Sequence, residues 1–394
     1  MKKIVSAALA ASLLAGAAFA DVKISTNYRL GTNLLTINPG EATGTDDVQA
    51  LNNLKSNWGD TTKIAASGEH AGIELDLKTS ESASSISMDY GYAWLGWGNF
   101  KLYGGTKDTR GALKRVNPLD GNWWNNYCEY GKPGIHKDVK AGLDASNLTV
   151  NTAGSKEVAF TAEYMIVDNI FVRAALFDMH SNDADKEAGQ ESLGDKLRFG
   201  VQFDMKHDMF NLNATFKYSK DDVTAADDDE LTFGIFVNPI LVPGLDLLLG
   251  FTYEDSDVAA SNGLKKDEAY IGIDVRASYK MDALTLSTLN NITLCDGDMI
   301  SWHTLGAAYK VNDVLTAAGL QLILNSTAKA AWADAGDAGN KSEYLAVRPY
   351  VDLTAQKNAV LSIGAELKFV NLMADSDEDV DFQFRVPVVM RVKL

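Results

Sequence analysis

The chain has 394 residues, and its 53 acidic residues against 36 basic ones give a formal net charge of −17 at pH 7. A balance this acidic argues against nucleic-acid binding, because the phosphate backbone attracts basic surfaces. Beyond the N-terminal residues, no segment offers the ~20 uninterrupted apolar residues that a membrane-spanning helix needs. Any membrane span must therefore consist of strands in a closed barrel, which satisfies its backbone hydrogen bonds internally.

Residues 1–20 have the pattern of a secretory signal peptide. Lys2 and Lys3 form a charged start, residues 4–17 form an apolar stretch, and Ala18-Phe19-Ala20 fits the small-x-small cleavage pattern. We therefore expect export of the chain and a mature N-terminus at Asp21.

From Asp21 onward the dominant sequence period is two, which is typical of strands with one apolar face. Residues 197–205 and 210–218 alternate apolar and polar side chains in this way. In residues 86–94 the same alternation places Tyr92 and Trp94 on the apolar face. The pattern predicts strands along most of the chain.

The C-terminal segment, residues 380–394, has the same design. Phe382, Phe384, Val386, Val388, Met390 and Val392 share one parity with Leu394, whereas Arg385 and Arg391 share the other. We expect this segment to pair with residues 21–30, so that the first and last strands close the sheet.

Short and long connections alternate between the predicted strands. The short ones are residues 69–71, 98–99, 167–169, 207–208, 281–282, 311–313 and 356–358, and the long, mostly acidic ones are residues 38–60, 181–195, 221–230, 255–267, 326–343 and 373–379. We therefore predict an all-β fold, a single antiparallel transmembrane β-barrel of about sixteen to twenty strands over residues 21–394, with short periplasmic turns and long acidic external loops. A soluble β-sandwich is the alternative, but its outer faces should carry charge on a parity that is apolar here.

The polar parity of the strands is expected to line the lumen of a wide barrel. The candidate lumen-wall residues are Arg29, Asp76, Asp89, Lys101, Arg198, Arg276, Arg348, Arg385 and Arg391. Charged side chains tolerate such a position only in water or in pairs, so the pattern predicts a water-filled channel.

Residues 107–135 differ from the other long connections, because they are neither acidic nor low in complexity. The segment holds Trp123, Trp124, Tyr127 and Tyr130, and a long loop with four aromatic side chains must bury them. We expect it to fold into the barrel mouth and narrow the pore. Its charged residues Arg110, Lys114, Arg115, Asp120 and Glu129 are the candidate constriction residues, while a surface loop with solvated charges remains the alternative.

The start of the predicted mature chain, ADVKI at residues 20–24, and the run AWLGWGNFKLYGGTK at residues 93–107 resemble general bacterial outer-membrane porins. The resemblance implies a diffusion channel in the outer membrane of a Gram-negative cell, with a third loop folded inward as the constriction. It also implies contact with outer-membrane lipids, insertion by the barrel-assembly machinery, and a homotrimer. The chain ends in Leu394, where the family commonly has phenylalanine.

The two cysteines give a separate prediction. Cys295 shares the lumen parity of its strand near the long-loop end, and Cys128 lies within the proposed constriction segment. A Cys128–Cys295 disulfide would tie that segment across the mouth, provided that the two Cα atoms come within ~7 Å. Two free thiols are the alternative.

No pattern in the chain indicates an enzyme, a cofactor or a dedicated metal site. The five histidines are scattered, and the acidic runs at residues 227–230 and 375–379 lack the spacing of a calcium loop. The leading hypothesis is a passive channel for small hydrophilic solutes and ions. The alternative is a surface-exposed outer-membrane barrel that acts as an adhesin or receptor through its acidic loops.

Overall fold

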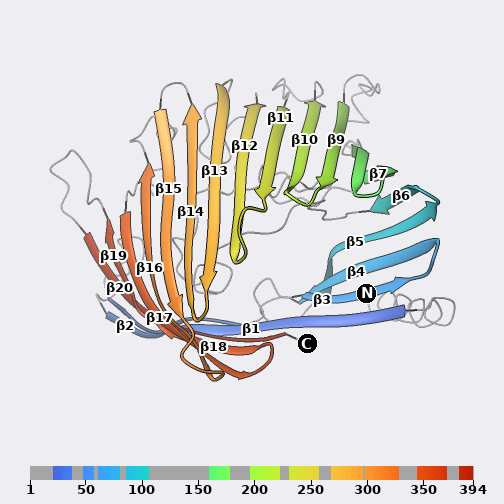
Figure 1. The fold of residues 1–394 in the computed structure, drawn as a ribbon. Helices are drawn as coiled ribbons and strands as arrows, with labels where there is room; N and C mark the ends of the chain where they lie inside the picture. Colours follow the sequence, from blue (N-terminus) through green and yellow to red (C-terminus); the bar gives the residue numbers. More distant parts are fainter. Residues whose placement is uncertain are drawn as a thin grey trace, which may run out of the picture.

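A computed structural model describes residues 21–37, 48–56, 61–79, 86–105, 159–177, 196–221, 230–256, 268–295, 298–327, 344–370 and 381–393. These residues form strands and tight turns (Figure 1). No helix among them is long and apolar enough to cross a membrane.

The strands follow one another along the chain with few other elements between them. They are β1 (Asp21–Ile37), β2 (Val48–Ser56), β3 (Thr61–Ser67), β4 (Ala71–Thr79), β5 (Ile86–Trp97), β6 (Phe100–Gly105), β7 (Ala159–Val167), β8 (Ile170–Phe177), β9 (Lys196–Lys206), β10 (Phe210–Asp221), β11 (Glu230–Pro239), β12 (Leu245–Ser256), β13 (Glu268–Met281), β14 (Leu284–Cys295), β15 (Asp298–Tyr309), β16 (Leu315–Thr327), β17 (Tyr344–Gln356), β18 (Ala359–Gly364), β19 (Glu366–Val370) and β20 (Asp381–Lys393).

Antiparallel pairing between neighbours closes these strands into one barrel. In Figure 1 β9 to β16 stand side by side along one wall, and β1 crosses below them. β2 and β3 lie end to end on one edge of β1, and β18 and β19 lie end to end between β17 and β20. Counting each end-to-end pair as one stave, the twenty described strands make eighteen staves. This confirms the predicted antiparallel barrel and its size range.

The closing pair of strands is the predicted one, but its register is displaced. Residues 27–37 of β1 pair with residues 384–393 of β20, whereas residues 21–26 pair with β3. The prediction of a loop over residues 38–60 was wrong in part, because β2 lies within it and extends the wall beside residues 30–37. β1 has 17 residues, which is long enough for β2 and β3 to pair with it end to end along one edge.

The two-residue turns each contain a residue in the left-handed region. These residues are Gly98 (φ 56°), Asn169 (φ 70°), Asp282 (φ 49°) and Asn358 (φ 72°). Glycine, asparagine and aspartate adopt this conformation at the least steric cost, so they reverse the chain within two residues. All four turns lie at the same end of the barrel, because the staves between them alternate in direction.

The two faces of the barrel wall differ in chemistry. On the outer face large apolar side chains stay accessible, as shown by Ile235 (38%), Leu249 (40%), Phe251 (41%) and Ile273 (40%). The alternate residues point to the inner face, where polar side chains such as Gln202 are buried. An apolar outer belt with a polar interior is the arrangement of a transmembrane barrel rather than of a soluble sheet.

Candidate functional site on the inner wall of the barrel

Arg173 lies between two carboxylates on the inner wall. Its Nε donates to Glu163 Oε2 at 2.6 Å, and its Nη1 donates to Asp204 Oδ2. The three side chains come from β8, β7 and β9, and the backbone register places Arg173 directly opposite Glu163. All three are at least nine-tenths buried. A guanidinium held by two carboxylates satisfies the buried charges and fixes three neighbouring staves.

Neutral groups complete this network from the flanking staves. Tyr103 Oη donates to Glu163 Oε1 at 3.1 Å, and Gln202 Nε2 and Asn213 Nδ2 donate to Asp204 at 2.7 Å and 2.8 Å. The network thus runs from β6 to β10 along the inner wall. Each acceptor that it contains lies on the parity predicted for the lumen.

A second charged pair lies on β13. Arg276 donates to both carboxylate oxygens of Asp274, from Nε at 3.1 Å and 3.2 Å and from Nη2 at 2.9 Å. The two residues are two positions apart on one strand and therefore share a face. Asn291 Nδ2, on the neighbouring β14, lies 3.5 Å from Asp274 Oδ2. This pair is neutral as a unit.

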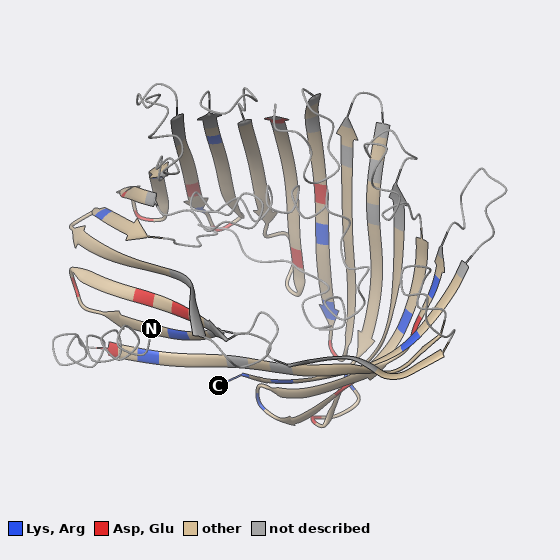
Figure 2. Cartoon of the chain, turned by 180° about the vertical axis from the view of Figure 1, so that it is seen from behind, with Lys and Arg blue, Asp and Glu red and all other residues tan. Residues whose placement is uncertain are grey.

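Basic residues predominate where β17, β19 and β20 meet. Arg348 on β17 pairs with Glu366 on β19, and Glu366 lies opposite Arg385 of β20 in the register. The Nζ of Lys368 lies 4.2 Å from the centre of the Tyr344 ring, within the range of a cation–π contact. In Figure 2 blue bands gather on these strands, at the lower right of the view. Three buried basic side chains around one carboxylate make this the basic sector of the wall.

A different chemistry occurs on β3 to β6. Lys63 Nζ donates to Glu74 Oε1 at 2.7 Å, and Tyr92 Oη donates to Glu74 Oε2 at 3.3 Å. The ring centres of Tyr92 and Tyr103 are 6.0 Å apart in an edge-to-face arrangement. Asp76, two residues beyond Glu74, is 3% exposed. This sector combines aromatic rings with two carboxylates, Glu74 and Asp76, and two lysines, Lys63 and Lys101.

Trp94 is held flat against the wall by a glycine. A Cβ on Gly72 would lie 2.2 Å from Trp94 Nε1, so only glycine leaves room for the indole there. The Nζ of Lys101 lies 5.1 Å from the centre of the Trp94 ring. The indole therefore bridges β4, β5 and β6 on the inner wall.

The structure places six of the sequence-predicted wall residues on the inner face of the described strands. They are Asp76, Lys101, Arg276, Arg348, Arg385 and Arg391. It brings Arg348 and Arg385 into one sector and keeps Arg276 with Asp274. The side chains of Arg29, Asp89 and Arg198 lie outside the described part of the chain. So do Arg110, Lys114, Arg115, Asp120, Cys128 and Glu129 of the predicted constriction, and the side chain of Cys295.

The prediction that Tyr92 and Trp94 face outward was wrong. The register between β4 and β5 shifts between Asp76 and Leu77, so that Tyr90 pairs with Asp76 while Met88 pairs with Leu77. Asp89 is the extra residue of this bulge. An extra residue exchanges the two faces of a strand, which turns Tyr92 and Trp94 inward.

The alternation also missed inward apolar side chains. Leu289, Ile323, Tyr344 and Ala346 form one buried cluster across β14, β16 and β17, and Phe236 is fully buried on β11. Consecutive apolar residues, such as the run around Leu248, are the only sequence signal of such positions. Within the described residues, no three His, Cys, Asp or Glu side chains lie together as metal ligands.

Comparison with solved structures gives the fold type. The chain is similar to OccK3 (OpdO) of Pseudomonas aeruginosa, with 10% identity over 97% of this chain and 98% of that one and a TM-score of 0.51. It is also similar to a porin refined at 1.8 Å, with 13% identity over 95% of this chain and all of that one and a TM-score of 0.51. No family model and no curated protein matches the chain. At these identities the likeness establishes a porin-type barrel fold.

Proposed function

We propose that the protein is a passive, water-filled channel for small hydrophilic solutes and ions. The observation that carries this proposal is the placement of Glu163, Arg173 and Asp204 on the inner wall of a barrel whose outer wall is apolar. An inner wall with charge on most staves favours a wet lumen over one packed like a protein core. The proposed role is transport without chemistry, and it requires no cofactor.

The proposed location is the outer membrane of a Gram-negative cell. Residues 1–20 act as a cleavable signal peptide, because they combine a charged start, an apolar stretch and a small-x-small cleavage pattern. The partners are the outer-membrane lipids, the barrel-assembly machinery during insertion, and further copies of the chain in a homotrimer. Mass spectrometry of the purified protein should give a mature chain that starts at Asp21.

The segment 107–135 is the proposed constriction. β6 and β7 pair directly, so this segment connects two adjacent staves at the end of the barrel opposite the two-residue turns. The four aromatic side chains of this segment support an inward fold, because a long loop gains from burying them. Arg110, Lys114, Arg115, Asp120 and Glu129 then set the charge of the narrowest part.

A Cys128–Cys295 disulfide is proposed to hold this segment in place. In the β14 register Cys295 has the parity of the inward-facing Asn291, at the strand end away from the turn at Asp282. Peptide mapping of freshly isolated protein with and without reductant tests the bond. A cross-linked peptide pair is expected, whereas two unmodified thiols would exclude the disulfide.

Liposome swelling tests the channel itself. Liposomes containing the protein are placed in isotonic solutions of sugars of increasing size, and the swelling rate is followed by light scattering. We expect fast swelling with small sugars and a size cut-off. Swelling no faster than in protein-free liposomes, with the barrel verified as inserted, would overturn the proposed function.

A further inference from the structure

A chain of polar side chains lies on the outer wall, on the face that carries the apolar belt. His303 Nδ1 and Asn290 Oδ1 are 2.9 Å apart, Asn290 Nδ2 donates to Thr288 Oγ1 at 3.0 Å, and Thr288 Oγ1 donates to the carbonyl of Thr304 at 2.9 Å. The register pairs Asn290 with His303 across β14 and β15. Both residues have the outward parity of Leu286 and Leu305, which are 41% and 60% exposed.

This polar chain lies deep within the apolar belt. Asn290 and His303 each lie near the middle of a 12-residue strand, so they fall near the centre of the apolar belt. The residues beside them in the register are Val275 on β13 and Leu324 on β16. Lipid offers only hydrocarbon at this depth, and an imidazole and a carboxamide keep hydrogen-bonding capacity that hydrocarbon cannot satisfy.

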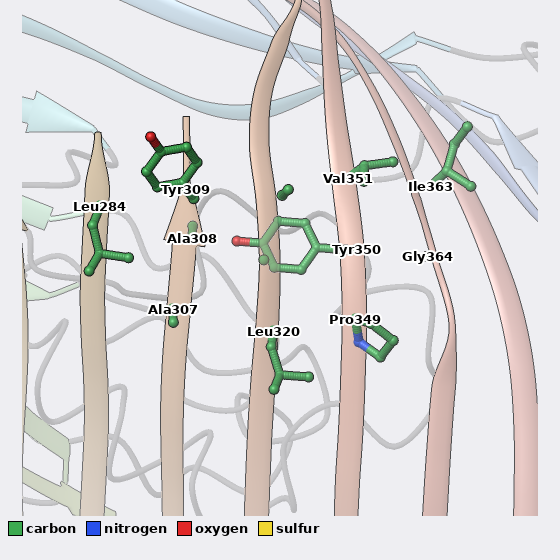
Figure 3. A pocket seen from close by; sticks show the side chains of 12 residues that line it. Leu284, Ala307, Ala308, Tyr309, Leu320, Pro349, Tyr350, Val351, Ile363 and Gly364 are labelled. Atoms are coloured by element: carbon green, nitrogen blue, oxygen red, sulfur yellow. The ribbon is translucent and has the colours of Figure 1, made fainter. Parts of the chain in front are cut away.

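The same face carries two hollows beside this polar chain. A hollow of about 440 Å³ is lined by the small residues Ala277, Thr288 and Ala307 and by the larger Tyr279 and Leu305. A second hollow of about 560 Å³ continues across β14 to β18, between Leu284, Tyr309, Leu320 and Pro349 (Figure 3). Small residues beside exposed large ones provide both the ridges and the grooves of a close contact within a membrane.

We propose that this face, the outer wall of β13 to β16, is the contact between copies of this chain, with the Asn290–His303 pair at its centre. The inference rests on the proposed insertion in a membrane. Copies inserted in the same direction are related by an axis along the membrane normal, which keeps every residue at its depth. A second copy therefore brings another Asn290–His303 pair to the same level, where the two pairs can exchange hydrogen bonds.

The electrostatics of the face favour a second copy over another partner. Its described outward residues on β13 to β16 include no Asp, Glu, Lys or Arg near Asn290 and His303, although the whole chain carries a net charge of −17. Identical faces of this kind meet without charge repulsion, and nothing on them selects a partner of opposite charge.

The test replaces the two polar groups by an apolar side chain and measures assembly. The double variant Asn290→Leu, His303→Leu is compared with the wild-type protein by native mass spectrometry in detergent over a range of protein concentrations. We expect the fraction of oligomer at a fixed concentration to fall about tenfold or more. The matched control is Thr26→Val with Thr62→Val, which removes an outward threonine pair (3.2 Å) between β1 and β3 and should leave assembly unchanged.

Cysteine cross-linking gives a second readout that does not depend on a destabilising change. In a background with Cys128→Ser and Cys295→Ser, Leu305→Cys is compared with Phe160→Cys, which is 68% exposed on the far outer wall. The inference requires dimer cross-links from Leu305→Cys and few from Phe160→Cys. Equal cross-linking, a monomeric wild type, or an oligomer that persists in the leucine variant would overturn it. Conductance per barrel should persist in the leucine variant, so failure of this inference is distinct from failure of the proposed channel.

Discussion

At the scale of single residues, the inner wall is stabilised by charges that are satisfied only as a group. Arg173 neutralises Glu163 and Asp204 at once, and both carboxylates are buried. Removing the cation leaves two buried negative charges side by side, which costs far more than the loss of one hydrogen bond. Removing the basic partner should therefore lower the free energy of unfolding strongly in a buried ion pair and little in an exposed one.

Arg173→Met is predicted to lower the free energy of unfolding by about 3–5 kcal/mol. The measurement is urea unfolding of the barrel in detergent, followed by tryptophan fluorescence. The control is Lys310→Met, which removes the exposed pair between Lys310 and Asp313 (2.7 Å). That pair lowers the pKa of Asp313, but solvent screens it, so no measurable loss of stability is expected. Similar losses in the two variants would contradict the account of the buried network.

Gly72→Ala is predicted to destabilise the barrel by about 1–3 kcal/mol, because the new Cβ would displace the Trp94 indole from the wall. Gly104→Ala is the comparison, since its Cβ would lie 3.5 Å from Phe160, an ordinary contact. The same unfolding assay applies to both. A tolerated alanine at residue 72 would show that the indole does not depend on this glycine.

At the scale of the elements, periodicity predicts strands well and their faces less well. The alternation in residues 210–218 is uninterrupted, and β10 follows it from end to end; in residues 380–394 only Pro387 and Val389 depart from it, and β20 keeps the predicted faces. The bulge at Asp89 leaves the local sequence amphipathic on both sides, so nothing in that segment alone reveals the exchange of faces. The partners of Arg173 also could not be predicted, since Glu163 and Asp204 meet it only through the register of three strands.

Deletion of residues 112–130 is predicted to raise single-channel conductance, because it removes the proposed constriction while leaving β6 and β7 paired. A deletion of residues 330–341, within another long connection, serves as the control and should leave conductance close to that of the full chain. Planar-bilayer recording of both variants gives the comparison. Unchanged conductance after the first deletion would place segment 107–135 outside the conducting path.

At the scale of the whole molecule, the eighteen staves of the described residues close through β1 and β20 and separate an apolar exterior from a charged interior. The interior is divided around its circumference into a basic sector on β17 to β20 and an aromatic sector on β3 to β6 whose described charges balance. The side chains that define the two sectors all lie on strands, so the division does not depend on residues of the long connections.

The two sectors predict opposite effects of charge removal on ion preference. Arg385→Gln should shift the reversal potential in a salt gradient toward cation preference, whereas Asp76→Asn should shift it toward anion preference, because each removes a fixed charge from the inner wall. Arg385 and Asp76 are both nearly buried, at 3% exposure each, so the shifts should be of similar size. Shifts in the same direction would contradict the assignment of these residues to the conducting wall.

Single-channel recording in planar lipid bilayers tests the central claim most directly. The purified barrel is inserted at low density and the current is followed at fixed voltage in a simple salt solution. A water-filled lumen predicts discrete, step-like increases of current, one per insertion event, that scale with salt concentration. A barrel verified as inserted and folded that passes no current would contradict the account.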